Sequence, residues 1–345
     1  MLLFNINYVI VYGLLAIAGF SFATSPGINK TDKLNNQLII LFSLLLFFLF
    51  GGRAFNVGDD TGMYIRAFQE ERVSGNIGFS MFADIVRLFS GSGRFFLYAI
   101  SFIFMLPICL FFCGVKYENK FLLFFMFVNM FSFVAMGINI VRQGIGVSLF
   151  LLAIYYLEKR RILTAVVLLF VSFSFHYSMI IPIGMYLVSR KLNTIIIPLI
   201  CFIVAIPLSM IAFDFFGLLR SIPVLGGWFP LADGIGGIEL HERYRTGFRL
   251  DFFIFNLFFA MLGLFYYNRI IKIFPQYRVY FSVYLFTSAF FFLMFHVPFS
   301  DRFGLFSWIF IPFLMFPFVQ QENIFPKFGK IFSLMLISMI HILIT

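Results

Sequence analysis

Long apolar runs that are almost free of charge recur from one end of this sequence to the other. Residues 38–50, LIILFSLLLFFLF, form one of these runs and contain no charged residue. Across the 345 residues, 62% are hydrophobic and 12% are charged, whereas soluble domains carry about 25% charged residues. Apolar helices of about 17 residues or more can cross the hydrocarbon core of a bilayer. The sequence therefore predicts an all-α polytopic membrane protein built as a single integral membrane domain.

We predict about twelve spans, within a range of ten to thirteen. The apolar run at the N-terminus lacks the basic start of a signal peptide, so we interpret it as the first span. Gly137 and Asn139 favour a hairpin or a kink, which leaves the number of spans between residues 120 and 190 open. The predicted spans are residues 4–23, 36–52, 95–114, 120–136, 138–157, 161–176, 177–189, 193–213, 251–268, 278–296, 303–320 and 329–345.

The basic residues predict the orientation of these spans. Lysine and arginine concentrate in cytoplasmic loops, and twelve spans place every lysine on one side. Both termini and two large loops, 53–94 and 214–250, then lie on the outer side. The net charge of +10 is spread over many short loops, which fits membrane topology better than nucleic-acid binding. The lysines are Lys30, Lys33, Lys116, Lys120, Lys159, Lys191, Lys272, Lys327 and Lys330.

On this topology the outer side carries arginine but no lysine. A guanidinium is a planar donor fork that suits phosphate and carboxylate, whereas a lysine is a mobile point charge. This predicts an outer face that binds anionic groups in a defined geometry. Internal pairing with the acidic residues of the same side is the alternative, and the two can hold for different residues. The outer arginines are Arg53, Arg66, Arg72, Arg87, Arg94, Arg142, Arg220, Arg243, Arg245, Arg249 and Arg302.

The first outer stretch, GGRAFNVGDDTGMYIRAFQEER, occupies residues 51–72. Its glycines surround Asp59 and Asp60, which predicts a turn and a helix that begins at Asp60 or Thr61. A second amphipathic piece, IGFSMFADIVRLF, follows, and we expect both helices to lie at the membrane interface. Simple helix capping is the alternative role for the two aspartates.

Two further stretches place polar groups at the outer ends of apolar helices. INIVRQG, residues 138–144, contains Arg142 and Gln143, and a charge inside a span usually faces an internal cavity. Snorkelling of the arginine to the interface is the competing explanation. FSFHYSMIIP contains His176, for which the alternative is an ordinary hydrogen-bonded interfacial residue.

The last two stretches are the end of the second large loop and the short loop near residue 300. Six glycines in residues 226–247 predict a mobile loop or lid. Charged residues gather at the end of this loop, where it approaches the next predicted span, namely Glu242, Arg243, Arg245 and Arg249. FHVPFSDRFGLF holds three more candidates in a short loop, His296, Asp301 and Arg302, for which a structural Asp–Arg pair is the alternative. HExxH is absent, so no metal site is predicted.

These five stretches, in this order, resemble the EpsG-like branch of the Wzy-type O-antigen and exopolysaccharide polymerases. The resemblance covers roughly residues 35–320, and the loop over 226–250 matches least. Its motifs are Arg53, Gly58, Asp60 and Tyr64; the Arg-Gln-Gly start of a helix at Arg142 to Gly144; Phe175, His176 and Ser178; and Arg302, Phe303 and Pro312.

The resemblance implies a GT-C-like membrane glycosyltransferase without metal or cofactor. Such polymerases join lipid-linked oligosaccharide repeat units on the periplasmic face of the bacterial inner membrane, in O-antigen and lipopolysaccharide biosynthesis. The implied partners are an undecaprenyl-diphosphate-linked donor and acceptor, membrane lipids and a chain-length regulator protein, with no nucleic acid.

This reaction requires cationic groups for the diphosphate and a general base for the acceptor hydroxyl. Direct displacement with inversion needs the fewest groups, and a retaining mechanism through a carboxylate nucleophile stays open. The candidate bases are Asp60, His176, Glu242 and Asp301. The candidate residues for binding the diphosphate or the glycan are Arg53, Tyr64, Arg142, Gln143, Arg243, Arg245, Arg249, His296 and Arg302.

Three rival functions stay open. A flippase or transporter of the same glycans should scatter charge through many spans around a midplane site. An O-antigen ligase would use the same donor with a lipid A-core acceptor. A multi-span acyltransferase would instead centre on an Arg–His pair and an acyl donor at the inner face.

Overall fold

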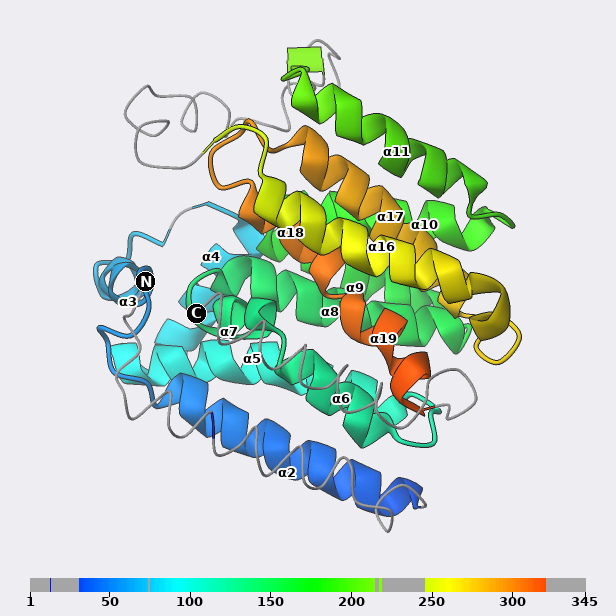
Figure 1. Ribbon diagram of the computed structural model, residues 1–345. Helices are drawn as coiled ribbons and strands as arrows, with labels where there is room; N and C mark the ends of the chain where they lie inside the picture. The colour runs from blue at the N-terminus through cyan, green and yellow to red at the C-terminus, as the bar shows by residue number, and fades with distance from the viewer. Residues whose placement is uncertain (1–12, 14–30, 74, 215–216, 219–245, 321–345) are drawn as a thin grey trace. The chain divides into compact units, whose positions relative to one another are not determined.

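The computed structural model describes residues 13, 31–73, 75–214, 217–218 and 246–320. Every regular element over these ranges is a helix, in agreement with the predicted all-α class (Figure 1). The described residues belong to two compact units, and the boundary between them falls between Ile183 and Gly184, inside α10. Helices suit the apolar runs because a helix satisfies its backbone polar groups internally, without water.

The first unit is a set of helices packed along one another, and α10 begins at its end. In it α2 packs against α5, α5 against α8, and α8 against α9 (Figure 1). The ring of Phe50 on α2 lies 6.1 Å from that of Phe104 on α5 and 5.8 Å from that of Phe133 on α7, measured between centroids. The helices are α2 (Asp32–Gly51), α3 (Thr61–Gln69), α4 (Ile77–Phe89), α5 (Gly93–Gly114), α6 (Lys120–Val128), α7 (Phe131–Ile138), α8 (Val141–Glu158), α9 (Ile162–Phe175), the 3-10 turn η2 (Tyr177–Met179) and α10 (Ile180–Lys191).

The second unit is held together by a buried polar network around Asn256. The hydroxyls of Ser288 and Ser307 each donate to Asn256 Oδ1 at 3.1 Å, and the Tyr284 hydroxyl donates to the Asn256 carbonyl at 2.7 Å. A satisfied network of this kind fixes the register of the helices that supply it. These helices are α16, α17 and α18. The described helices that follow α10 are α11 (Ile196–Met210), α16 (Leu250–Ile270), α17 (Tyr277–Leu293), α18 (Asp301–Trp308) and α19 (Ile311–Gln320).

Four described segments are long and apolar enough to cross a membrane: α2, α5, α16, and α18 with α19 taken together. The bent pair α6 and α7 would make a fifth. Helices stand wherever spans were predicted between residues 36 and 320, but their lengths do not show twelve crossings, so that number stays a prediction. The predicted spans 4–23, apart from Gly13, and 329–345 lie outside the described residues.

The helix predicted over residues 120–136 is broken. Its two halves, α6 and α7, meet at 66° around Asn129 and Met130. The Asn129 side chain donates to the Phe125 carbonyl at 2.8 Å, and asparagine side chains compete in this way with the backbone ladder. The second break, predicted near Asn139, is confirmed, because α7 ends at Ile138 and α8 begins at Val141.

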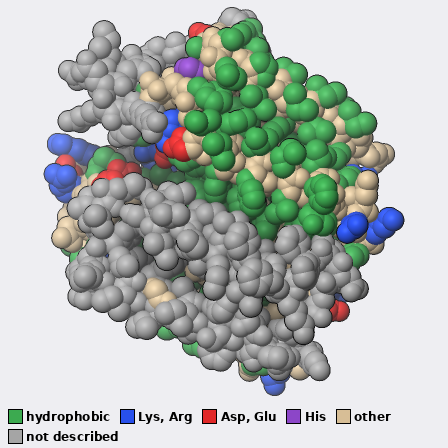
Figure 2. Space-filling view, viewed as in Figure 1, with side chains coloured by type: hydrophobic (Ala, Val, Ile, Leu, Met, Phe, Trp, Pro, Cys, Tyr) green, Lys and Arg blue, Asp and Glu red, His purple; other side chains and the backbone are tan. Residues whose placement is uncertain are grey.

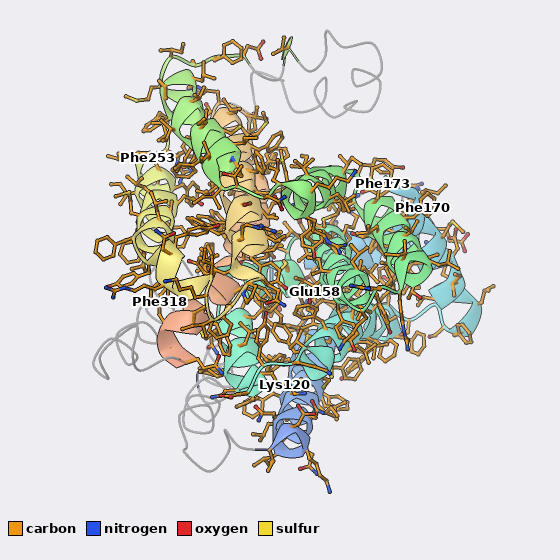
Figure 3. The ribbon with its side chains drawn as sticks, turned by 90° about the vertical axis from the view of Figure 1, so that its right-hand side faces the viewer. Lys120, Glu158, Phe170, Phe173, Phe253 and Phe318 are labelled. Carbon is orange, nitrogen blue, oxygen red and sulfur yellow. The ribbon has the colours of Figure 1, made fainter. Side chains whose placement is uncertain are left out.

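Lysine and arginine mark opposite ends of α2. Lys120, labelled in Figure 3, is only 2% exposed; its ammonium pairs with Asp32 at 2.6 Å and donates to the Cys113 carbonyl at 2.8 Å. Asp32 is the first residue of α2, and Arg53 stands two residues after its last residue, Gly51. A helix of this length spans about 30 Å, so the two charges lie at different ends of the first unit.

Apolar side chains are exposed on several described helices. Figure 2 shows hydrophobic side chains gathered over one face of the molecule. Leu163 on α9 is 80% exposed and Phe265 on α16 is 81% exposed. Large apolar side chains that are exposed on several neighbouring helices indicate a surface that contacts a membrane or another protein.

Candidate functional site

Arg53 braces the turn that follows α2. Its side chain is 3% exposed; Nη1 donates to the Phe50 carbonyl at 2.7 Å and Nε donates to Thr61 Oγ1 at 3.1 Å. Arg94, at the start of α5, donates to the carbonyls of Arg53 and Gly51. The guanidinium of Arg53 therefore points into the protein, toward the Phe50 carbonyl and the Thr61 hydroxyl. These hydrogen bonds, with those of Arg94, connect the turn to both α2 and α5.

The two aspartates occupy different positions in that turn. α3 begins at Thr61 with Asp60 at its N-cap position, as predicted, but the Asp60 side chain makes no capping hydrogen bond. Asp59 is exposed, and its main-chain N–H donates to Asn139 Oδ1 at 3.1 Å. Asp60 is half-buried. The capping alternative therefore does not describe the Asp60 side chain.

Arg142 reaches from α8 to the first outer stretch. Its guanidinium carbon lies 5.9 Å from the centre of the Tyr64 ring, a cation–π arrangement. It also lies beside Gly75, where a Cβ would stand 2.5 Å from Arg142 Nη1 and where φ is +114°. Gln143, the next residue, is 2% exposed. The structure thus brings the first and second sequence stretches together.

The third stretch lies at the same end of the first unit. His176 Nδ1 is 2.6 Å from Ser178 Oγ, and the Tyr177 hydroxyl accepts the Ile77 N–H of α4 at 3.4 Å. The ring of Phe173, labelled in Figure 3, stands 5.3 Å from the Tyr177 ring. His176 itself is half-buried.

Contacts between α8 and the segment around His176 fix where the histidine lies. Ser172 Oγ donates to the Gly146 carbonyl at 2.7 Å, and a Cβ at Gly146 would stand 2.8 Å from Met179 Cγ. Gly146 follows Arg142 by about one helical turn. His176 and Arg142 therefore lie on packed neighbours, near the N-terminal end of α8.

The remaining described candidates belong to the second unit. Arg249 forms a bidentate pair with Asp251, at 3.1 and 2.6 Å, and lies over the Phe252 ring at 4.2 Å. Asp301 begins α18, and the guanidinium of Arg302 lies 4.5 Å from the centre of the Phe299 ring. Glu242, Arg243 and Arg245 lie outside the described residues.

His296 is oriented by a backbone group of α11. Its Nε2 lies 2.8 Å from the Ser209 carbonyl oxygen. A carbonyl oxygen only accepts, so Nε2 carries the hydrogen in this contact. Nε2 is then a donor, and any proton that His296 accepts must go to Nδ1.

Internal pairing accounts for part of the outer arginine set. Arg72 pairs with Glu70 at 3.5 Å, and Arg87 pairs with Asp84. Arg249 pairs with Asp251 at 2.6 Å. For these three arginines the pairing alternative is confirmed. Among the residues that the structure describes, no group of three or more His, Cys, Asp or Glu side chains is placed to hold a metal ion.

Sequence reasoning missed three residues that shape the site: Thr61, Arg94 and Asn139. Thr61 is fully buried, and its hydroxyl accepts a hydrogen bond from Arg53. Arg94 donates to the backbone carbonyls of Gly51 and Arg53. The side-chain oxygen of Asn139 accepts the Asp59 N–H. Asn139 stood in the quoted stretch INIVRQG, but its sequence position did not reveal which group it binds.

The packed apolar helices and the polar groups at their ends define a helical membrane protein. The model of the EpsG family matches residues 36–345, nearly the whole chain, and the chain belongs to that family. No curated protein and no solved structure matched the chain.

Proposed function

We propose that this chain is a membrane glycosyltransferase that polymerises lipid-linked oligosaccharide repeat units of an O-antigen-type polysaccharide. The growing glycan leaves undecaprenyl diphosphate and is joined to the non-reducing end of an incoming lipid-linked unit. Membership of the EpsG family supports this class of activity. The observation that carries the site is the placement of Arg142 over Tyr64, in contact with the loop that follows the Asp60 turn.

The reaction is a displacement at a sugar carbon. The acceptor hydroxyl attacks the anomeric carbon of the donor, and the bond from that carbon to the diphosphate oxygen breaks. The diphosphate leaves with the electron pair, while the hydroxyl proton passes to a base. Arg142 offers a planar donor fork to the charge that grows on the leaving diphosphate. This route inverts the configuration of the sugar carbon and uses no metal.

Asp60 is the base that we favour, and His176 is the second candidate in the same unit. Asp60 is half-buried at the N-cap position of α3 and stands one turn before Tyr64, over which Arg142 lies. His176 shares a hydrogen bond of 2.6 Å with Ser178, which orients its ring. Glu242 and Asp301 stay candidates for the same role.

We assign Arg53 a supporting role in this mechanism. Its side chain is 3% exposed, and its guanidinium donates to two acceptors of the protein. It therefore supports the turn that carries Asp60, and Arg142 provides the primary contact with the diphosphate. His296, Arg302 and Arg249 of the second unit stay candidates for contacts with the glycan or the second diphosphate.

Both substrates of the proposed reaction are bound to the membrane by their lipid. The donor and acceptor are anchored in the outer leaflet of the bacterial inner membrane, which places their phosphates near the ends of the spans. We propose that the two large loops face the periplasm and that a chain-length regulator protein is a partner.

Deletion of the gene, followed by electrophoresis of the surface polysaccharide, tests this function. Loss of the ladder with a single repeat unit retained is the expected result. Loss of every repeat unit would instead indicate a ligase or a flippase, and an unchanged ladder would exclude all three. Complementation with the unaltered chain is the control.

A further inference from the structure

We propose that Asn139 is a positioning residue that holds the Asp59–Asp60 turn against the break between α7 and α8, and so sets Asp60 relative to Arg142. This inference rests on the proposed function only for its effect on turnover. The contact itself is a hydrogen bond from the Asp59 N–H to Asn139 Oδ1, 3.1 Å long. Asn139 is half-buried and lies three residues before Arg142.

The backbone of Asn139 is itself fixed, which makes its side chain a firm support. Asn139 is the C-cap of α7, and its own N–H donates to the Ala135 carbonyl at 2.9 Å. α8 begins two residues later, at Val141. The acceptor oxygen and the base of the Arg142 side chain therefore belong to one short, hydrogen-bonded corner.

Gly58 shows that the turn sits directly on this corner. Its φ is +83°, and a Cβ at this position would overlap Asn139 Oδ1 and Ile138 Cγ2. Only glycine allows both this backbone conformation and this approach. The Asp59 amide is thus brought to the asparagine by a turn with no room for a side chain.

The same turn is tied on its other side to α2 and α5. Arg53 links the Phe50 carbonyl to Thr61, and Arg94 holds the Arg53 carbonyl. Without Asn139, these contacts would still attach the turn to α2 and α5, but none of them connects it to the corner that carries Arg142. Asn139 therefore links the two halves of the candidate site through a hydrogen bond.

The rate of a displacement reaction depends on how precisely the base and the group that binds the diphosphate are positioned relative to each other. A misplacement of reacting groups by about 1 Å costs about 10²-fold in rate, even where binding is kept. We expect Asn139→Leu, which removes the acceptor at similar size, to lower kcat by about 10²-fold with little change in KM. A residue with a purely structural role would lower the amount of folded protein and leave kcat per folded molecule unchanged.

The test uses the purified full chain in lipid nanodiscs, with lipid-linked repeat units isolated from the deletion strain. Amide hydrogen exchange is followed in the peptide that contains Asp59, alongside kcat and KM. Asn56→Leu is the matched control, because Asn56 is an exposed asparagine of the same loop. Asn139→Leu should speed exchange of the peptide and lower kcat, while Asn56→Leu should leave both as in the unaltered chain.

A second pair of variants covers the case in which Asn139→Leu fails to fold. Gly58→Ala should displace the turn and give the same loss of kcat. Gly62→Ala is its control, since the nearest atom to a Cβ there is 3.7 Å away.

Unchanged exchange in Asn139→Leu would overturn the contact, and faster exchange with normal kcat would overturn the positioning role. An unaltered chain without any turnover would count against the proposed function, and with it the positioning role. The exchange measurement would still report separately on the contact.

Discussion

The guanidinium of Arg142, in the first turn of α8, lies over the ring of Tyr64 on α3, with its central carbon 5.9 Å from the ring centre. Arg142 belongs to a mostly apolar helix, and Tyr64 belongs to a short helix of the loop after α2. A charge at the centre of a span would cost about 2.5–3.5 kcal/mol on insertion scales. Arg142 lies instead in the first turn of its helix, where it meets the loop after α2.

Arg142→Lys should abolish long polysaccharide chains without lowering the protein level. Lysine keeps the charge but loses the planar fork that binds a phosphate through two parallel bonds. The ladder on a gel and an immunoblot measure the two quantities. Arg72→Lys is the control, because the Arg72 side chain is 80% exposed and pairs only loosely with Glu70. A ladder of normal intensity from Arg142→Lys would favour simple snorkelling.

Asp60→Asn should lower polymerisation by about 10²-fold or more, because an amide cannot accept the proton of the acceptor hydroxyl. Asp59→Asn should be much milder, since Asp59 contributes its main-chain N–H to the contact with Asn139 and its side chain is exposed. Turnover of lipid-linked repeat units by the two purified variants measures the difference. Equal and mild effects would move the base to His176 or to the second unit.

Arg53→Ala should destabilise the fold by about 1–3 kcal/mol, because it leaves buried acceptors without their donor. Denaturation in detergent, followed by the loss of helical circular dichroism, provides the measurement. Arg66→Ala is the control at an exposed position of α3 and should stay within about 0.5 kcal/mol. Unchanged stability together with a lost ladder would instead make Arg53 a direct ligand.

α4 should lie in the membrane interface. One face of this helix exposes Ile77, Met81 and Ile85 by 52% or more, and Leu88 by 84%. A polarity-sensitive fluorophore at Leu88→Cys, in a cysteine-free background, should report an apolar environment in nanodiscs. The same probe at Arg72→Cys, in the segment before α4 where the side chain is 80% exposed, should report water. Equal, water-like signals would show that α4 stands clear of the lipid.

The loop that contains Ser92 should face the periplasm, and Lys191 should face the cytoplasm. An impermeant thiol reagent should label Ser92→Cys, but not Lys191→Cys, in intact spheroplasts. This expectation follows from the lysine-free outer side of the predicted topology. The reverse pattern of labelling would invert the topology and remove the case for an outer-face site.

Local features of the fold were predictable, and features set by packing were not. The helix over IGFSMFADIVRLF is α4 with the expected bounds, and α3 begins at Thr61 as expected, because amphipathic spacing and a helix start depend on neighbouring residues. The break at Asn129 was missed, because one asparagine in an apolar run does not reveal that its side chain will bond to the preceding turn. The role of Arg53 was also not visible, because its burial depends on Thr61 and Arg94.

The sequence by itself determined the class of this protein. The length of its apolar runs, the low share of charged residues and the match to the EpsG family are properties of the linear chain, and none of them requires a contact between distant residues. Only the tertiary structure decided which polar groups meet: Asn139 with the Asp59 amide, Arg142 with Tyr64, and His296 with the Ser209 carbonyl. Each of these pairs joins segments separated by whole helices, so their distances depend on how those helices pack and where they break.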